Sequence, residues 1–128
     1  KRIEAAAKVA GAGYPLGFIV APIYLHEGWK EGYYRMFEKL NDELPKEARK
    51  DITFEFIQHR FTKPAKRVIE KNYPMTKLEL KEEARRYKWG RYVIGKYVYK
   101  KEQEEEMKRH LADCLEKFFP EAKLEYFT

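Results

Sequence analysis

The chain has little of what metal sites and covalent catalysis require. Its 128 residues include one cysteine, Cys114, and three scattered histidines. A single cysteine excludes an internal disulfide and favours a reducing compartment. No Cys-x2-Cys or His-x3-His pair is present, and there is no Gly-rich phosphate loop, nucleophile elbow or Ser-His-Asp set. We therefore expect neither a catalytic residue nor a metal ligand within the chain.

Long apolar segments are also lacking. No run approaches the ~20 residues that a membrane span requires, and no signal peptide is recognisable. These absences predict a soluble, cytoplasmic protein without a membrane partner. The chain begins at Lys1 rather than at Met, and its first residues already follow a helical pattern. We interpret this beginning as that of a piece of a longer protein.

Aromatic and basic residues, by contrast, are abundant. The chain has ten Tyr, eight Phe and two Trp, enough apolar surface for one domain around one core. Of its 27 Lys and Arg, 14 lie between Arg60 and Lys101, together with only 4 of its 21 Asp and Glu. This segment has a net charge of +10 in a chain whose net charge is +6. A local positive field of this kind attracts polyanions.

Apolar spacing predicts alternating helices and strands in the first half. Ile3–Ala10 has helical spacing, and the apolar run Leu16–Leu25 is typical of a strand covered on both faces in a parallel sheet. Trp29–Leu44 carries an apolar helical stripe that ends at Pro45, and Ile52–Gln58 is rich in β-branched and aromatic residues. Strand, helix and strand in this order predict a crossover between two parallel strands.

The second half has a different character. Thr62 is placed to cap a helix that runs to Asn72. Arg85–Tyr99 is rich in aromatic and β-branched residues, broken by two glycines, which predicts a β-hairpin. A last helix, Lys101–Phe119, and a short strand, Ala122–Phe127, follow. Cys114 lies on the apolar stripe of this helix, where we expect an inert core residue.

The predicted hairpin is the most informative element. Its cations alternate with aromatic residues: Arg85, Arg86, Lys88, Arg91 and Lys96 with Tyr87, Trp89, Tyr92 and Tyr97. Cations bind phosphates, and aromatic rings stack on bases or wedge between them. The alternative is a solvated edge hairpin whose charges prevent aggregation. The interleaved aromatic residues favour nucleic acid as the partner.

The ends of the two predicted parallel strands form a second candidate site, because ligands of parallel sheets bind beyond the carboxyl ends of the strands. The residues there are Ala21, Pro22, Tyr24, His26 and Glu27 after the first strand, and Gln58, His59 and Arg60 after the second. His26 and His59 are possible acid–base groups. With no partner evident in the sequence, a structural role is the preferred interpretation for both.

Several segments together resemble one known family. They are AGYPLGFIVAPI (12–23), HEGW (26–29), DITFEFIQHRFTKPAKR (51–67), YKWGRY (87–92), GKY (95–97) and LEYFT (124–128). The whole chain resembles the C-terminal third of the spore photoproduct lyases, radical S-adenosylmethionine enzymes that repair ultraviolet-damaged DNA. The resemblance implies an α/β fold, the C-terminal part of a partial (β/α)6 TIM-type barrel with an added hairpin and helix. Residues 1–75 would be the last two βα units, and residues 76–128 the hairpin, last helix and final strand.

The resemblance also implies cofactors and a substrate. The family uses a [4Fe–4S] cluster and S-adenosylmethionine to make a 5′-deoxyadenosyl radical, which reverses the lesion 5-thyminyl-5,6-dihydrothymine in spore DNA. Ala21 would lie beside the adenosylmethionine. Cys-x3-Cys-x2-Cys, which binds the cluster, and a hydrogen-donating cysteine would lie upstream of this chain, and Cys114 matches neither. We therefore expect the chain alone to be inactive, and the remainder of the same polypeptide to be its partner in the cytoplasm of a bacterial spore former.

For the hairpin, the resemblance implies contact with double-stranded DNA. Arg91 and Tyr92 would occupy the gap left by the everted thymine dinucleotide. The other DNA-binding residues that we expect are Trp89, Lys88, Arg86 and Lys96. One position departs from the family pattern, since Val93 stands where we expect glycine, and a β-branched residue does not readily adopt a positive φ.

Two other functions remain open. The chain can be a stand-alone nucleic-acid-binding module without catalytic activity, or its basic segment can contact an acidic partner protein.

Overall fold

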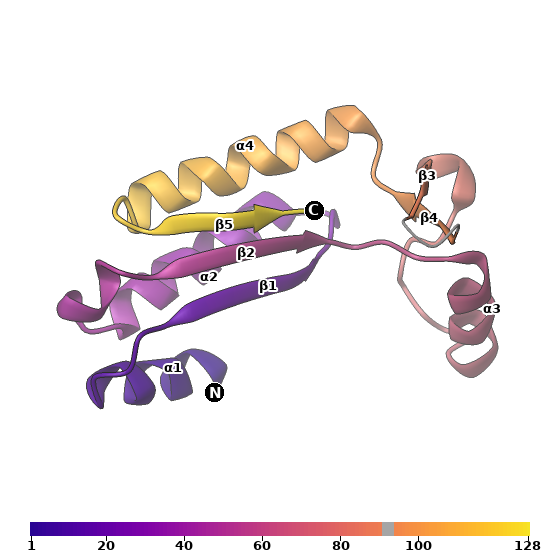
Figure 1. The fold of residues 1–128 in the computed structure, drawn as a ribbon. Coiled ribbons are helices and arrows are strands. Elements are labelled where there is room, and N and C mark those ends of the chain that lie inside the picture. The colour runs from indigo at the N-terminus through magenta and orange to yellow at the C-terminus, as the bar shows by residue number, and fades with distance from the viewer. Residues whose placement is uncertain (91–93) are drawn as a thin grey trace.

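Helices and strands alternate along the chain, apart from two consecutive strands that form a hairpin (Figure 1). The computed structural model describes residues 1–90 and 94–128. The helices are α1 (Arg2–Gly11), α2 (Trp29–Glu43), α3 (Lys63–Asn72) and α4 (Lys101–Phe118), with short 3-10 helices at Lys46–Arg49 and Glu82–Ala84. The strands are β1 (Gly17–Ile23), β2 (Thr53–Gln58), β3 (Arg86–Trp89), β4 (Gly95–Val98) and β5 (Lys123–Phe127). Within the described residues, no helix is both long and apolar enough to cross a membrane.

A parallel sheet with the strand order β1–β2–β5 forms the larger part of the molecule. β1 pairs with β2 from Gly17 opposite Thr53, and β2 pairs with β5 from Thr53 opposite Lys123. The predicted crossover between two parallel strands is confirmed. The second crossover, from β2 to β5, contains α3, the hairpin and α4 (Figure 1). The carboxyl ends of the strands therefore lie on the side of the sheet where the hairpin begins.

The core lies between the sheet and helices α1, α2 and α4. Phe54 and Phe56 of β2 are fully buried, and so are Phe37 of α2 and Met107 of α4. Cys114 is also buried in this cluster, as expected for an inert core residue. The last helix and strand thus share one core with the first half of the chain.

The opposite face of the sheet is open in the described chain. Ile19 of β1 is 65% exposed, while its neighbours Phe18 and Val20 on the helix-covered face are half-buried. The prediction that this apolar strand is covered on both faces is wrong for the described chain. The physical reason is that α1, α2 and α4 all pack in the one core cluster on the other face.

The hairpin and α3 form a second, smaller packing unit beyond the strand ends (Figure 1). Thr62 caps α3 as predicted, because its hydroxyl accepts a hydrogen bond from the backbone N–H of Ala65 at 3.2 Å. Phe61, just before this cap, pairs with Tyr97 of β4 through both backbone hydrogen bonds, 3.2 and 2.7 Å long. The chain leaving β2 thus holds the hairpin in place.

Candidate functional site

The hairpin has two chemically different faces. β3 and β4 pair antiparallel, with Tyr87 opposite Tyr97 and Lys88 opposite Lys96. Residues directly opposite each other point to the same face, and adjacent residues point to opposite faces. One face therefore carries the aromatic rings, with Tyr97 5.2 Å from both Phe61 and Tyr87 between ring centroids. The other face carries the lysines.

Two glycines shape the hairpin towards its turn. A Cβ at Gly95 would overlap the hydroxyl and ring of Tyr87, so glycine is what lets this tyrosine lie across β4. The Gly90 N–H donates to the Ile94 carbonyl at 3.1 Å, and a Cβ at Gly90 would lie 2.8 Å from that oxygen. Trp89 and Ile94 beside the turn are 65% and 63% exposed. The structure thus offers large apolar side chains to solvent at the end of the hairpin.

Glu82 joins the aromatic face to α3. The Tyr97 hydroxyl donates to the Glu82 carboxylate at 2.5 Å, and Lys63 and Lys66 lie 3.2 and 3.7 Å from the same carboxylate. The Tyr97 hydrogen bond, followed by the lysines, holds the pKa of Glu82 below its usual range. These contacts engage the aromatic face at Tyr97, while Tyr87 and Trp89 on the same face remain exposed to solvent.

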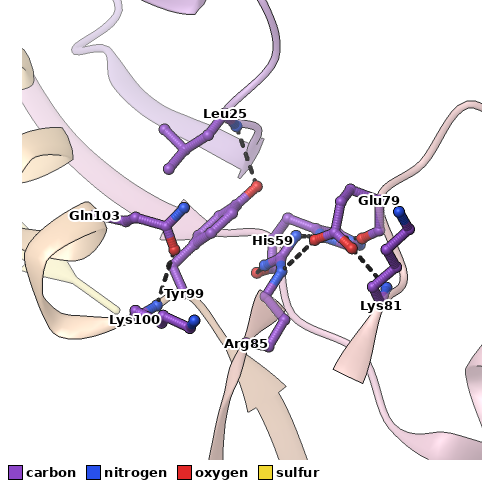
Figure 2. Close-up of polar contacts among 8 residues, drawn as sticks. All are labelled: Leu25, His59, Glu79, Lys81, Arg85, Tyr99, Lys100 and Gln103. Atoms are coloured by element: carbon purple, nitrogen blue, oxygen red, sulfur yellow. Dashed lines mark hydrogen bonds and ion pairs between the residues drawn. The ribbon is translucent and has the colours of Figure 1, made fainter. Parts of the chain in front are cut away.

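At the base of the hairpin, Arg85 is buried and fully engaged. Its guanidinium donates to the Glu79 carboxylate at 2.9 Å, to the His59 carbonyl at 3.1 Å and to His59 Nδ1 at 3.3 Å. It also stacks 3.7 Å from the centroid of the Tyr99 ring. Figure 2 shows Arg85, Glu79 and His59 pointing toward one another. A buried charge with this many partners is satisfied, and the contacts fix both the hairpin and the loop that carries Glu79.

Tyr99 extends this cluster to β1. Its hydroxyl accepts a hydrogen bond from the Leu25 N–H at 3.1 Å (Figure 2). Tyr24 packs on His59 with ring centroids 4.4 Å apart. The base of the hairpin is thereby tied to the carboxyl ends of both β1 and β2.

His59 is held neutral in this cluster. Burial, and then the nearby Arg85 cation, lower the pKa of His59 from 6.5 to about 4, although Glu79 acts in the opposite direction. A guanidinium only donates, so His59 Nδ1 must accept and the proton of the neutral ring must lie on Nε2. This geometry supports the structural interpretation of His59 over an acid–base role.

The remaining strand-end residues are not brought together as one catalytic group. Ala21 and Pro22 are exposed on β1, and the exposed His26 contacts the backbone oxygen of its neighbour Glu27 at 2.6 Å. Gln58 is buried, and its Oε1 has no hydrogen-bond partner among the described residues. A cleft of 510 Å³ does open beside them, lined by Tyr24, Leu25, His26, Thr76, Lys77, Leu78, Glu79 and Tyr99.

The predicted DNA-binding residues have different environments. Lys88 and Trp89 are exposed, and Lys96 is half-buried. Arg86 forms an ion pair of 3.1 Å with Glu104 at the start of α4. Burial, and then the neighbouring Arg60 and Lys88, lower the pKa of Lys96, while Tyr126 acts in the opposite direction. Arg91, Tyr92 and Val93 lie outside the described residues.

Sequence reasoning missed the role of Arg85. It counted this residue among the hairpin cations that alternate with aromatic residues, whereas the guanidinium is inside the protein. It also missed Glu79 and Tyr99, the partners that bury it. Only the position of Arg85 directly before the first hairpin strand distinguishes it in the sequence, and that position does not predict burial.

The described residues do not fit an iron–sulfur cluster. No group of three or more His, Cys, Asp or Glu among them is arranged to hold a metal ion. Cys114 is buried in the core, where burial raises the pKa of its thiol. A cysteine with this environment is a poor thiolate ligand.

The parallel sheet, its helices and the hairpin at the strand ends define a mixed α/β domain. The family model for spore photoproduct lyase matches residues 1–128. Spore photoproduct lyase of Bacillus subtilis (strain 168) is 71% identical over 128 residues, and that of Clostridium acetobutylicum is 41% identical over 125. The chain belongs to the spore photoproduct lyase family. It spans about 37% of the length of the Bacillus relative and 36% of the Clostridium one.

Solved structures of the family share the fold. A spore photoproduct lyase complexed with dinucleoside spore photoproduct has a TM-score of 0.91 and 58% identity over 98% of this chain and 37% of that chain. A mutant structure with bound AdoMet and dinucleoside spore photoproduct matches to the same extent. These structures support the mixed α/β fold with a parallel sheet.

Proposed function

We propose that the chain is the C-terminal part of a lyase that repairs 5-thyminyl-5,6-dihydrothymine in ultraviolet-damaged spore DNA. The observation that carries this proposal is the hairpin, with a lysine face and exposed apolar residues, held at the strand ends by Arg85. Family membership over the whole chain supports it. The proposed location is the cytoplasm of a spore-forming bacterium.

Within that enzyme, β1 and β2 would be the last strands of a partial (β/α)6 barrel. Residues 1–75 would supply the last two βα units, and residues 76–128 the hairpin, α4 and β5. The open sheet face with exposed Ile19 and Ala21 supports this proposal, because a barrel strand contacts further residues of the polypeptide on its inner side. Ala21, small and exposed, leaves room there for S-adenosylmethionine.

When bound, S-adenosylmethionine and a [4Fe–4S] cluster would supply the radical chemistry of the repair reaction. The cluster ligands would lie in the remainder of the same polypeptide, since the described residues offer none. What this chain contributes is binding and orientation. His59, neutral and bonded to Arg85, positions the hairpin and moves no proton in this proposal.

The hairpin would enter double-stranded DNA at the lesion. Arg91 and Tyr92 at its turn would fill the gap left by the everted dinucleotide, with Trp89 beside them and Lys88, Lys96 and Arg86 toward the backbone. A damaged pair stacks poorly, so its extrusion costs less than that of an intact pair. The hairpin turn would thus distinguish lesion-containing DNA from intact DNA, and the lysines would provide affinity for DNA of any sequence.

We expect the double substitution Arg91→Ala/Tyr92→Ala to weaken binding to lesion-containing duplex about tenfold more than binding to intact duplex, because only the lesion leaves a gap to fill. Fluorescence anisotropy with the two duplexes measures both affinities. Lys39→Ala/Lys50→Ala, which removes two exposed lysines far along the chain from the hairpin, is the control. Equal losses on both duplexes would show that the pair contributes general electrostatics alone.

The stand-alone nucleic-acid-binding module predicts the same hairpin but no catalytic half. The gene sequence upstream of Lys1 separates the two: an in-frame Cys-x3-Cys-x2-Cys supports the enzyme, and a start codon next to Lys1 contradicts it. An acidic partner protein instead predicts that the chain does not bind duplex DNA.

A further inference from the structure

Three cations lie together on the lysine face of the hairpin. Lys88 and Lys96 are directly opposite each other in the β3–β4 ladder. Phe61 is opposite Tyr97, so Arg60, one residue earlier, lies on the same face as Lys96, which is one residue before Tyr97. We call Arg60, Lys88 and Lys96 the cation trio.

The pKa of Lys96 is lowered by burial and then by its neighbours in the trio, which agrees with the pairing of the strands. Both Arg60 and Lys88 act on Lys96 to disfavour its charged form, in addition to its partial burial. Like charges directly opposite each other in an antiparallel pair destabilise the hairpin. The chain thus holds these three charges together at some cost to its own stability.

No carboxylate among the described residues lies within the 4.0 Å ion-pair distance of Arg60, Lys88 or Lys96. Glu104 acts on Lys88 from farther away: burial works to raise the pKa of its carboxyl, but Lys108, Arg86 and Lys88 lower it. Among the described residues, the Arg60 guanidinium donates a hydrogen bond to the hydroxyl of Thr128, at 3.4 Å. The contrast with Arg86 is informative, because that cation on the same face is paired with Glu104.

We propose that the cation trio is a binding site for one phosphodiester of the nucleic-acid backbone. The site would bind the strand as it passes between the hairpin and the carboxyl ends of β2 and β5. Its function is to fix the register of the DNA, so that the hairpin turn meets a defined nucleotide step. This inference rests on the proposed function, because it assumes that the hairpin binds DNA.

The convergence of three cations on one phosphate has a measurable signature. For duplex DNA, the logarithm of affinity falls with the logarithm of salt concentration with a slope of about −0.9 per neutralised phosphate. The triple variant Arg60→Ala/Lys88→Ala/Lys96→Ala should therefore lose about 0.9 from the magnitude of the slope. If the three cations instead contacted three separate phosphates, the magnitude of the slope would fall by about 2.7.

The experiment is a salt titration of duplex binding by fluorescence anisotropy, made with the intact polypeptide that contains this chain, and the fold of each variant is checked by circular dichroism. The matched control is Lys8→Ala/Lys39→Ala/Lys50→Ala, which removes three exposed cations on α1, α2 and the segment before β2. The control should keep the wild-type slope. A wild-type chain without salt-dependent DNA binding contradicts the proposed function itself. If the slope of the trio variant equals that of its control, or falls in magnitude by about 2.7, the shared phosphate site is contradicted while the proposed function stands.

A second variant tests the geometry without relying on loss of charge alone. Lys88→Glu places a carboxylate directly opposite Lys96 but also replaces the attraction between Lys88 and Glu104 by a repulsion, so we expect the melting temperature to change by less than about 2 °C. The same variant should weaken duplex binding at least tenfold, because the carboxylate repels the phosphate and engages Lys96. Unchanged DNA affinity of Lys88→Glu would overturn the phosphate site.

Discussion

The guanidinium of Arg85 joins the hairpin to the sheet. It contacts His59 at the end of β2, Glu79 in the following loop and the ring of Tyr99. Arg85→Lys retains the charge but cannot reproduce a planar group with several donors, so His59 and Glu79 lose partners. We expect the free energy of unfolding to fall by about 2–4 kcal/mol.

Urea denaturation measures this loss. The matched control is Arg67→Lys on the exposed part of α3, which should change the free energy of unfolding by less than about 0.5 kcal/mol. If Arg85→Lys were as mild as the control, the Arg85 contacts would contribute little to stability. Arg85→Lys should also weaken DNA binding in protein that remains folded, because the hairpin is no longer held in its orientation.

His59 makes stability depend on pH. Its pKa is about 4 in the folded chain and 6.5 unperturbed, so the unfolded chain binds the proton first as pH falls. The stability that neutral His59 provides is thus complete above pH 6.5 and is lost as the pH falls from 6.5 to 4. We expect this loss to be roughly 1–2 kcal/mol once solvent screening is included.

Melting temperatures between pH 4 and 7 at constant ionic strength measure this dependence. His59→Asn keeps an acceptor for Arg85 but cannot titrate, so its melting temperature should vary less over this range. The control His26→Asn, at an exposed histidine, should keep the wild-type profile. A His59→Asn profile parallel to wild type would place the pH dependence in other groups.

Among the elements, the hairpin depends most on a single backbone position. Gly95→Ala would place a methyl group where the hydroxyl and ring of Tyr87 lie. The tyrosine would have to leave the aromatic face, so we expect a loss of about 1–3 kcal/mol in the free energy of unfolding and weaker DNA binding.

Urea denaturation and anisotropy check both effects. The double variant Gly95→Ala/Tyr87→Ala removes the overlap and should recover part of the stability that Gly95→Ala loses. Gly11→Ala is the control, since a Cβ at Gly11 would meet no atom within 4 Å. If the double variant were no more stable than Gly95→Ala, the backbone of β4 rather than Tyr87 would require glycine at position 95.

The elements themselves were predictable because their signals are local. Helical spacing, the Thr62 cap and the two apolar strands each depend on neighbours in sequence, and the structure confirms them. For the candidate site, the sequence predicted which segment forms the hairpin but not which way each side chain points. Whether Arg85 faces DNA or the protein depends on Glu79, His59 and Tyr99, which meet it through tertiary packing that no sequence period encodes.

At the scale of the whole molecule, the sheet is covered on one face. Phe54 and Phe56 point into the helices, while Ile19 on the other face is 65% exposed. An exposed apolar sheet face next to an edge strand favours association with other chains. We therefore expect the 128-residue chain to be poorly stable and to aggregate when it is isolated.

Ile19→Thr tests whether the open face causes this behaviour. Because Ile19 is already exposed, threonine removes apolar surface from solvent contact at little cost, and the free energy of unfolding should change by less than about 0.5 kcal/mol. The aggregation rate, followed by light scattering, should fall. Val20→Thr is the matched control on the helix-covered face: it buries a hydroxyl, so it should destabilise by about 1 kcal/mol and should not slow aggregation. Equal destabilisation by the two substitutions would mean that Ile19 is covered in solution, and that the open face closes without the remainder of the polypeptide.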